Sequence, residues 1–463
     1  VIVTQHSGDG KANQYFLRGF NLDHGTDFRI AVDGIPVNMP SHGHGQGYSD
    51  INFLIPELVS GEQYRKGPYS AHDGDFSAAG SVNLDLLDSL PRRLAQATPG
   101  MFDHGRILLA ESMEVAGGSL LGGIEYLHDD GPWENPDDFR KYNGLARFSH
   151  GEAANGFTVT AMGYDGSWNA TDQIPLRAVS SGSLGRFAAV DPSDGGRSSR
   201  YSLSGAWSHA TGSGLTRVGL YALHYKLNLF SNFTYFRDDP VNGDQFEQTD
   251  RRFVAGFEAT HDWTGRIGEV DVTNTAGLQI RRDDIENGLF RSRERRRLST
   301  TRQDEILLYS VGPFFENRAR WSRKFRTIAG LRIDHQRASV ESDLSANSGA
   351  ADDTLVSPKL TLIAGPWKET ECYFNFGYGF HSNDARGATI RVDPGTRLPA
   401  HRVDPLVRAR GADIGVRTQI IPGLQSSLSV FALELDSELV FVGDAGSTEA
   451  TRPSRRTGIE FAN

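Results

Sequence analysis

The sequence contains a single cysteine, Cys372, among 463 residues. An internal disulfide and a cysteine-based metal site are therefore both excluded. No stretch reaches the roughly 18 consecutive apolar residues that a membrane-spanning helix requires, and only 38% of the residues are hydrophobic. These absences exclude a helical membrane protein but leave a β-barrel open, because barrel strands are apolar on one face only.

An excess of positive charge and the common enzyme motifs are also lacking. The formal net charge is −10, which argues against nucleic-acid binding. The sequence has no H-E-x-x-H, no G-x-S-x-G, no P-loop and no dinucleotide-binding motif, so we expect no enzyme activity, no catalytic residue and no cofactor. It has no positively charged start and no signal-peptide segment, and we expect both ends to be cut within longer elements.

From about residue 105 the sequence alternates with period two, which is typical of β-strands. In segment 372–380, one parity holds Cys372, Phe374, Phe376, Tyr378 and Phe380. Segments 253–263, 270–281, 325–334 and 412–420 alternate in the same way. Many of these runs are longer than the five or six residues that are usual in soluble sheets.

The links between successive strands are alternately short and long. The short links lie near 116–118, 151–155, 210–214, 264–268, 321–324, 366–369 and 421–423, and the long ones near 129–141, 166–199, 226–250, 282–303, 338–356 and 381–409. Outer-membrane barrels sort their links in this way, with tight turns facing the periplasm and long loops facing outside. We therefore predict an all-β transmembrane barrel with a polar lumen over residues 91–463, with about fifteen or sixteen strands.

Residues 1–90 differ, because Gly-rich turns separate short strands and the long alternating strands are missing. A wide barrel leaves a channel that must be gated. The sequence therefore predicts a small α+β plug domain over 1–90, placed inside the lumen of the barrel.

Several motifs carry a family resemblance. The run YFLRGFNLDHGTDFRIAVDGIPVN contains an Arg-Gly pair before a strand and an Asp-Gly turn after it, and a later run passes through a Gly-Pro pair to a closing strand. SPKLTL followed by CYFNFGYGFHSND is similar to a mid-barrel strand pair. In order and spacing the sequence resembles the TonB-dependent outer-membrane receptors over essentially its whole length. The resemblance assigns architectural plug roles to Arg18, Gly19, Asp33, Gly34, Gly67 and Pro68.

The resemblance implies a fragment of a roughly 22-stranded antiparallel barrel in the outer membrane of a Gram-negative bacterium. It implies a receptor that binds a scarce nutrient and releases it inward when a TonB-type inner-membrane complex, driven by the proton gradient, pulls on the plug. A ferric siderophore is the leading expected ligand, with cobalamin, an oligosaccharide or a copper chelate as alternatives. A passive porin, and a secreted β-rich hydrolase or adhesin, are the alternatives from other classes.

The stretch PSHGHGQGYSD, residues 40–50, would turn at the top of the plug by this resemblance. Six residues would then line the floor of the ligand vestibule: Asp23, His24, His42, His44, Gln46 and Tyr48. Glycines allow a ligand close to the backbone, and the polar side chains offer donors and acceptors. Three interpretations stay open: hydrogen bonding to the organic shell of a chelate, direct metal coordination by His42 and His44, and plain loop packing. We favour the first and assign no metal ligand, because two histidines are an incomplete site.

Two further groups fall in expected long external loops. The run RSRERRR, residues 291–297, contains Arg293 and Arg296. It predicts contact with lipopolysaccharide phosphates or steering of an anionic ligand, with a solvated charged loop as the alternative. His381 and His401 lie in another loop, where they either complete a binding site or are solvated.

Overall fold

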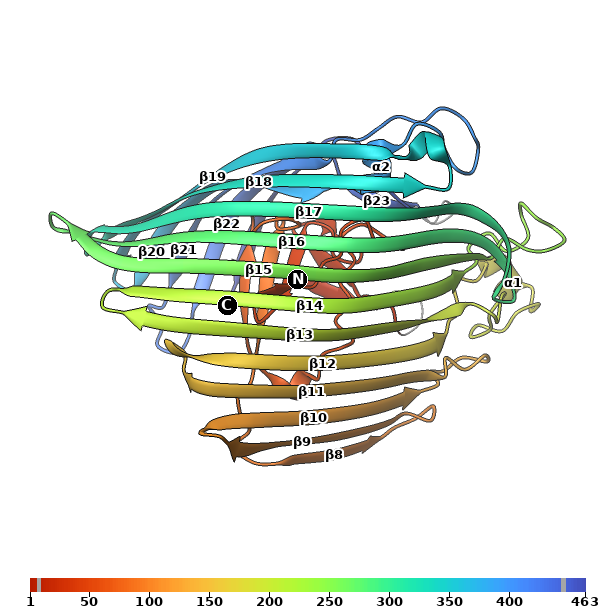
Figure 1. The fold of residues 1–463 in the computed structure, drawn as a ribbon, viewed down its shortest axis with the longest axis horizontal. Coiled ribbons are helices and arrows are strands. Elements are labelled where there is room, and N and C mark those ends of the chain that lie inside the picture. The colour runs from red at the N-terminus through yellow and green to blue at the C-terminus, as the bar shows by residue number, and fades with distance from the viewer. Residues whose placement is uncertain (6–9, 443–446) are drawn as a thin grey trace.

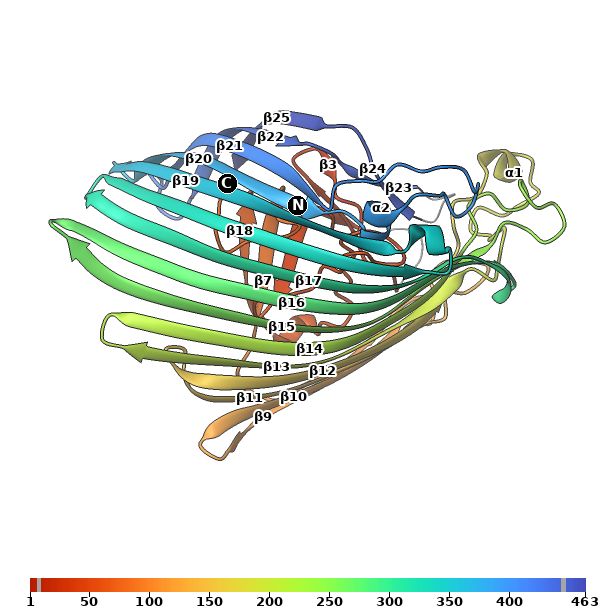
Figure 2. The ribbon, with the colours of Figure 1, turned by 45° about the horizontal axis from the view of Figure 1, so that its top comes forward.

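The computed structural model describes residues 1–5, 10–442 and 447–463. It consists of an N-terminal plug of short strands and an antiparallel sheet of sixteen strands that curves around the plug (Figure 1, Figure 2). The predicted fold class, a large antiparallel sheet with a plug inside it, is confirmed.

The plug contains a three-stranded sheet and a four-stranded sheet. In sheet order the first comprises β1 (Ile2–Thr4), β2 (Gln14–Leu17) and β3 (Phe20–Asn21), and the second β5 (Ile35–Pro36), β4 (Phe28–Val32), β7 (Gly80–Leu86) and β6 (Val59–Lys66). A 3-10 turn, η1 (Pro56–Leu58), precedes β6. All five residues of β4 are buried, because this strand lies between two others, and its apolar side chains belong to a core that the plug shares with the barrel.

The large sheet follows the order of the sequence, so that each strand pairs with the next. Its strands are β8 (Leu94–Pro99), β9 (Gly105–Val115), β10 (Gly118–Asp129), β11 (Phe139–Glu152), β12 (Asn155–Asn169), β13 (Gly195–Thr211), β14 (Gly214–Ser231), β15 (Phe246–Ile267), β16 (Val270–Arg293), β17 (Arg296–Ser322), β18 (Phe325–Ser342), β19 (Gly349–Trp367), β20 (Thr370–Ser382), β21 (Leu406–Thr418), β22 (Ser426–Leu435) and β25 (Ser454–Ala462). A separate hairpin, β23 (Leu439–Val442) and β24 (Ser447–Ala450), lies between β22 and β25. Three short helices lie in the connections: α1 (Leu176–Ser180), η2 (Ser345–Asn347) and α2 (Ala385–Thr389).

The two faces of the large sheet differ as the period-two pattern predicts. In β15 the inward side chains Asp250, Arg252 and Val254 are buried, whereas the outward Phe253 is 50% exposed. Large apolar side chains are exposed along the outer face of many strands, among them Leu203, Leu220, Ile280, Val311, Leu331 and Val356. Within the described ranges, no helix combines the length and apolar character needed to cross a membrane.

Short turns gather at one end of the sheet and most of the longer connections at the other (Figure 1). The expected long loop over 282–303 is wrong. β16 continues to Arg293 and β17 begins at Arg296, with Glu294 and Arg295 between them at φ angles of 51° and 62°. The two strands continue because the backbone N–H and C=O groups of each strand hydrogen-bond to those of the other. The charged side chains of this segment can face water on either side of the hairpin, so they do not oppose the pairing.

Candidate functional site

The plug apex loop, residues 40–50, folds back on itself between β5 and η1. An isolated bridge joins Met39 to Tyr48 across its base. Gln46 closes the loop from within, because its Oε1 accepts the N–H of Ser41 at 2.6 Å. The loop is therefore a defined structure rather than an extended connection.

The side chains that the sequence assigned to the ligand floor lie together, and most are buried. The exposed fraction is 1% for His24, 1% for His42, 3% for His44, 1% for Gln46 and 0% for Tyr48. The rings of His42 and Tyr48 stack with their centroids 4.2 Å apart. Asp23 is the member of the set that is partly exposed.

The apex loop lies directly against strand β15. The N–H of Gly43 donates to the Asp250 carboxylate at 2.9 Å, and the Gln248 amide donates to the Gly43 carbonyl at 3.1 Å. A Cβ on Gly43 would lie 2.5 Å from the carbonyl oxygen of Thr249. Only glycine permits this approach, so Gly43 serves contact with the barrel wall.

Arg252 of β15 is the central barrel contact, and its side chain is fully buried beside Asp250 at 2.6 Å. It donates to the Pro40 carbonyl at 2.8 Å and to the Ser41 carbonyl at 3.3 Å. Asn287 of β16 donates to the same Ser41 carbonyl at 2.6 Å. Because the apex loop lacks regular secondary structure, its buried carbonyls obtain their partners from the wall.

Other barrel side chains donate to carbonyl oxygens of the plug in the same way. The pairs are Arg281 with Asn38 at 2.9 Å, Arg386 with His42 at 2.9 Å, Asn143 with Asn52 at 2.8 Å, Lys359 with Pro68 at 2.8 Å and Arg332 with His72 at 3.2 Å. Sequence reasoning missed all of these donors. For Arg281, Arg332 and Lys359 the available signal was a charged side chain on the inward parity of a strand, whereas Asn143 is uncharged and Arg386 lies in α2.

The predicted loop contacts have different settings. His381 is not in a loop, because the pairing of β20 with β21 extends over it. It is fully buried, and its Nδ1 lies 2.9 Å from the carboxylate of Asp27 in the plug. His401 is exposed in the connection between β20 and β21, and Arg293 and Arg296 flank the turn at the end of the β16–β17 hairpin.

The plug positions taken as architectural lie at turns and at the wall. Arg18 pairs with Asp413 and with Glu460, each at 3.0 Å. Asp33 pairs with Arg147 of β11. Positive φ angles, which favour glycine, occur at Gly19, Gly34 and Gly67.

Burial shifts the pKa of two groups in the apex loop in opposite senses. It lowers the pKa of His42 to about 3 despite the nearby Asp250 carboxylate, and the charge of Arg252 adds to the shift. Burial raises the pKa of Asp50 to about 6, although the Asn52 N–H donates to this carboxylate at 2.8 Å. At neutral pH, His42 is therefore uncharged.

A cavity of about 530 Å³ lies between the plug and the barrel wall. It extends from Asn38 and Pro40, at the start of the apex loop, to residues 149–153, at the end of β11 and in the turn that follows. Charged side chains line it from both partners, among them Arg29, Asp85, Glu258 and Arg281. The cavity is thus lined by charged and apolar side chains together, and it reaches the start of the apex loop.

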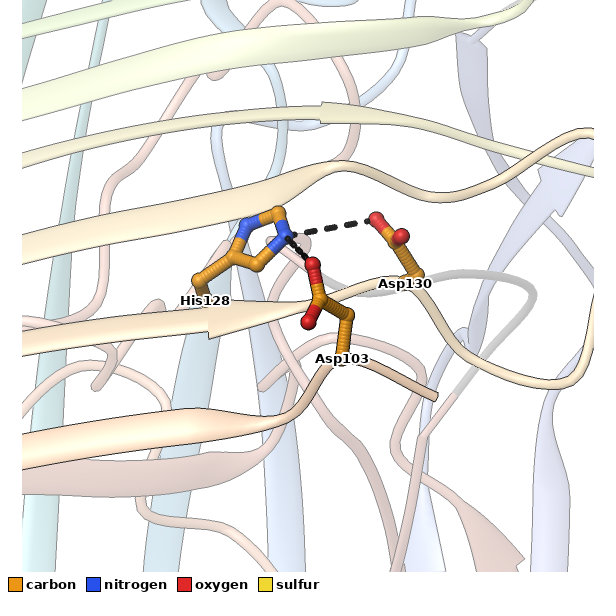
Figure 3. Close-up of side chains that lie close together, drawn as sticks. All are labelled: Asp103, His128 and Asp130. Atoms are coloured by element: carbon orange, nitrogen blue, oxygen red, sulfur yellow. Dashed lines mark ion pairs between the residues drawn. The ribbon is translucent and has the colours of Figure 1, made fainter. Parts of the chain in front are cut away.

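A second group of possible metal ligands comes from the ends of the outer strands (Figure 3). The Nε2 atom of His128 lies 3.6 Å from the Asp103 carboxylate and 3.4 Å from that of Asp130. The Asp103 side chain is 82% exposed, and ion pairs of this kind at a surface are weak. We assign no metal to this group.

Two family models match the chain. The model described as TonB dependent receptor-like, beta-barrel, matches residues 122–463, and the TonB-dependent Receptor Plug Domain matches residues 1–81.

Solved structures share the fold. The unliganded ferric citrate transporter FecA has 12% identity and a TM-score of 0.79 over 99% of this chain and 69% of that chain. The copper transporter OprC has 16% identity and a TM-score of 0.75 over 99% of this chain and 71% of that chain. The siderophore receptor PiuA from Acinetobacter baumannii has 12% identity and a TM-score of 0.76 over 99% of this chain and 72% of that chain. At these identities the likeness shows the fold alone.

The contribution of the barrel wall to the stability of the apex loop can be tested at Arg252. Replacing Arg252 by Met removes the donors to Pro40 and Ser41 and leaves Asp250 buried with its ion pair broken. We expect the local free energy of opening of residues 38–50 to fall by about 3–5 kcal/mol, measured by amide hydrogen exchange.

The matched control is Arg251→Met on the opposite face of the same strand. The Arg251 side chain is 56% exposed and pairs with Glu286, so its loss should change the same free energy by less than about 1 kcal/mol. Equal effects of the two variants on hydrogen exchange would contradict the assigned role of Arg252.

The raised pKa of Asp50 predicts a pH dependence. Its folded value of about 6 lies above the value of 3.8 for an unperturbed carboxyl, so the folded plug binds more protons between these values. Stability should therefore fall as the pH rises from about 4 to about 6, by at most about 3 kcal/mol. Asp50→Asn should remove this part of the dependence in unfolding measured across that range. An unchanged slope would show that Asp50 is not its source.

Proposed function

This chain belongs to the TonB-dependent receptors, and from that membership we propose that it binds a scarce nutrient outside the cell and passes it to the periplasm with proton-gradient energy. The family is one of outer-membrane β-barrel receptors and transporters rather than enzymes. We favour a ferric siderophore as the nutrient and a TonB-type inner-membrane complex as the energy-transducing partner.

The observation that carries the proposal is the plug bound to the inner wall through its own carbonyl oxygens. The contacts that Arg252, Arg281 and Lys359 make with the plug are hydrogen bonds, which break and re-form without covalent chemistry. Many such bonds together must be displaced before a bulky solute can pass. This need for work favours energised uptake over the alternative of a passive porin.

The apex residues are proposed as the ligand floor, with Asp23 and His24 beside His42, His44, Gln46 and Tyr48. Asp23 offers a partly exposed carboxylate, and the buried members become available when the loop separates from the wall. The cavity of about 530 Å³ that reaches the loop is the proposed path inward. Neighbours in fold include carriers of ferric citrate and copper, and a copper chelate, cobalamin or an oligosaccharide remain alternative cargoes.

A contact with lipopolysaccharide is proposed at the outer face of the barrel. A groove of about 610 Å³ there is lined by Arg197, Lys226 and Arg295 together with Asp165. Cations in such a groove attract lipid phosphates. This position supports the interpretation of the arginine-rich hairpin tip as a lipid contact, since Arg295 belongs to both.

The proposed function can be tested in cells that carry the protein, with radiolabelled ferric complexes of a hydroxamate and of a catecholate siderophore as probes. We expect a protonophore to stop accumulation while binding at the cell surface continues, because release into the periplasm needs the proton gradient. Cells without the protein are the control. Accumulation that persists with the protonophore would support the porin. Binding of neither complex, with uptake of cobalamin or a copper chelate instead, would overturn the siderophore assignment.

A further inference from the structure

Arg200 is an inward arginine of β13 whose charge finds no partner on the barrel wall. Only 5% of the residue is exposed. Its Nε and Nη1 atoms are buried, and neither has a hydrogen-bond partner among the described residues. Burying a charge that is neither paired nor hydrogen-bonded costs free energy. The surroundings of Arg200 must therefore offset this cost in another way.

The wall positions directly beside Arg200, all within the described ranges, hold no carboxylate. Its neighbours on the same face of β13 are Ser198 and Ser202, and the residues directly opposite it on β12 and β14 are Tyr164 and Tyr225. Other inward arginines pair with an aspartate two residues away: Arg252 with Asp250, Arg281 with Asp283 and Arg332 with Asp334. Arg200 lacks this arrangement, so its charge is left for a group in the lumen.

The plug covers Arg200 with the segment that ends the apex loop, residues 50–53. The guanidinium carbon lies 4.2 Å from the ring centre of Phe53, and the carboxylate of Asp50 is the charged group that acts most strongly on it. Oδ2 of Asp50 is itself buried without a hydrogen-bond partner among the described residues. Phe53 and Asp50 are each 3% exposed. The plug thus shields this cation and partly offsets its charge, but leaves two of its nitrogens without an acceptor.

Arg200 lies on the proposed path inward. The strand register places it in one row with Arg252, the apex-loop contact, because Tyr225 of β14 is directly opposite both. Ser204, four residues further along the same face of β13, lines the cavity of about 530 Å³. Arg200 is therefore level with the apex-loop contact and above the cavity. When residues 50–53 leave the wall, its guanidinium faces the entrance of that cavity.

The chemistry of an exposed guanidinium at this place selects for negative charge. Its N–H donors form a planar fork that matches the two oxygens of a carboxylate. A cargo with a carboxylate would replace Asp50 as the counter-charge and would accept from the nitrogens that now lack a partner. An uncharged cargo would leave the cation unpaired as it passes, which is costly in a space with little water.

We propose that Arg200 is a specificity-determining residue of the path, which receives a carboxylate of an anionic chelate after residues 50–53 have moved away. This inference rests on the proposed function and narrows its cargo to chelates with negatively charged oxygen groups. Because the plug covers Arg200 until it moves, the residue acts on passage and not on the first binding of the cargo outside.

The first test needs no cargo and follows amide hydrogen exchange of residues 50–54 in the detergent-solubilised protein. Citrate, a tricarboxylate, is compared with sodium chloride at equal ionic strength. Citrate reaches Arg200 only after this segment has left the wall, so it favours the open state. At a few times its dissociation constant it should speed the exchange about threefold. Arg200→Gln should abolish this effect. Arg251→Gln, whose side chain is 56% exposed on the outer face, is the matched control and should keep it.

The second test follows import into cells. Two radiolabelled ferric complexes serve as probes, an anionic one with free carboxylates and an uncharged trihydroxamate. Arg200→Gln should lower import of the anionic complex at least about tenfold, because a hydrogen bond to a charged group is lost. Its binding at the cell surface and the import of the uncharged complex should not change. Arg200→Lys keeps the charge and should retain more import than Arg200→Gln. Folding of each variant is checked by the heat-dependent gel migration of the barrel.

The outcomes separate this inference from the proposed function. Accumulation of neither complex would count against siderophore import, whereas the citrate experiment would still decide the role of Arg200. The inference is overturned if citrate leaves exchange in the unaltered protein unchanged or speeds it equally in Arg200→Gln. It is also overturned if that variant imports both complexes at equally reduced rates, or if the unaltered protein imports the uncharged complex alone.

Discussion

The plug depends on one constraint, that carbonyl groups buried in irregular backbone must find donors. The apex loop provides few of these bonds for itself, and an aqueous lumen would provide them only from water. In this protein the inner wall provides them, through Arg252 and Asn287 at the apex and through Lys359 lower down. These hydrogen bonds act together with apolar packing, because buried side chains of the plug and of the wall share two hydrophobic clusters.

The wall keeps its own buried charges in balance by a repeated arrangement. An arginine and an aspartate two residues apart on one strand face the lumen together, so the carboxylate neutralises the cation while further N–H groups remain for the plug. The pairs are Arg252 with Asp250 at 2.6 Å, Arg281 with Asp283 at 2.7 Å and Arg332 with Asp334 at 2.7 Å. Buried pairs of this kind add little net stability but are costly to break, so they specify where the plug lies. An arginine that leaves a plug carbonyl stays neutralised by its aspartate, which would suit the opening of this contact in the proposed function.

The barrel could be predicted from the sequence because its strands obey a local rule. The alternation of apolar and polar residues in 253–263 and 325–334 predicted strands, and the short links between such segments predicted the tight turns. Neither the hairpin at Glu294 nor the burial of His381 follows from local pattern, because both depend on how far neighbouring strands continue to pair. The apex loop shows the same limit. Gly43 approaches the barrel wall, but the sequence does not distinguish such a glycine from one that approaches a ligand. Its partners lie about 200 residues away along the chain, beyond the reach of a local pattern.

In the proposed function, the apex loop must leave the wall before a nutrient can pass. Ser41 and Ala385 suit a direct test, because the Oγ of Ser41 accepts the Ala385 N–H at 2.9 Å, so the two residues are in contact and cysteines at these positions can be tested for a disulfide. In a Cys372→Ser background, Ser41→Cys with Ala385→Cys would be compared with each single variant under oxidising and reducing conditions. We expect the oxidised pair to bind a ferric siderophore without importing it, and reduction to restore import. Import at the same rate with the bond closed would contradict it.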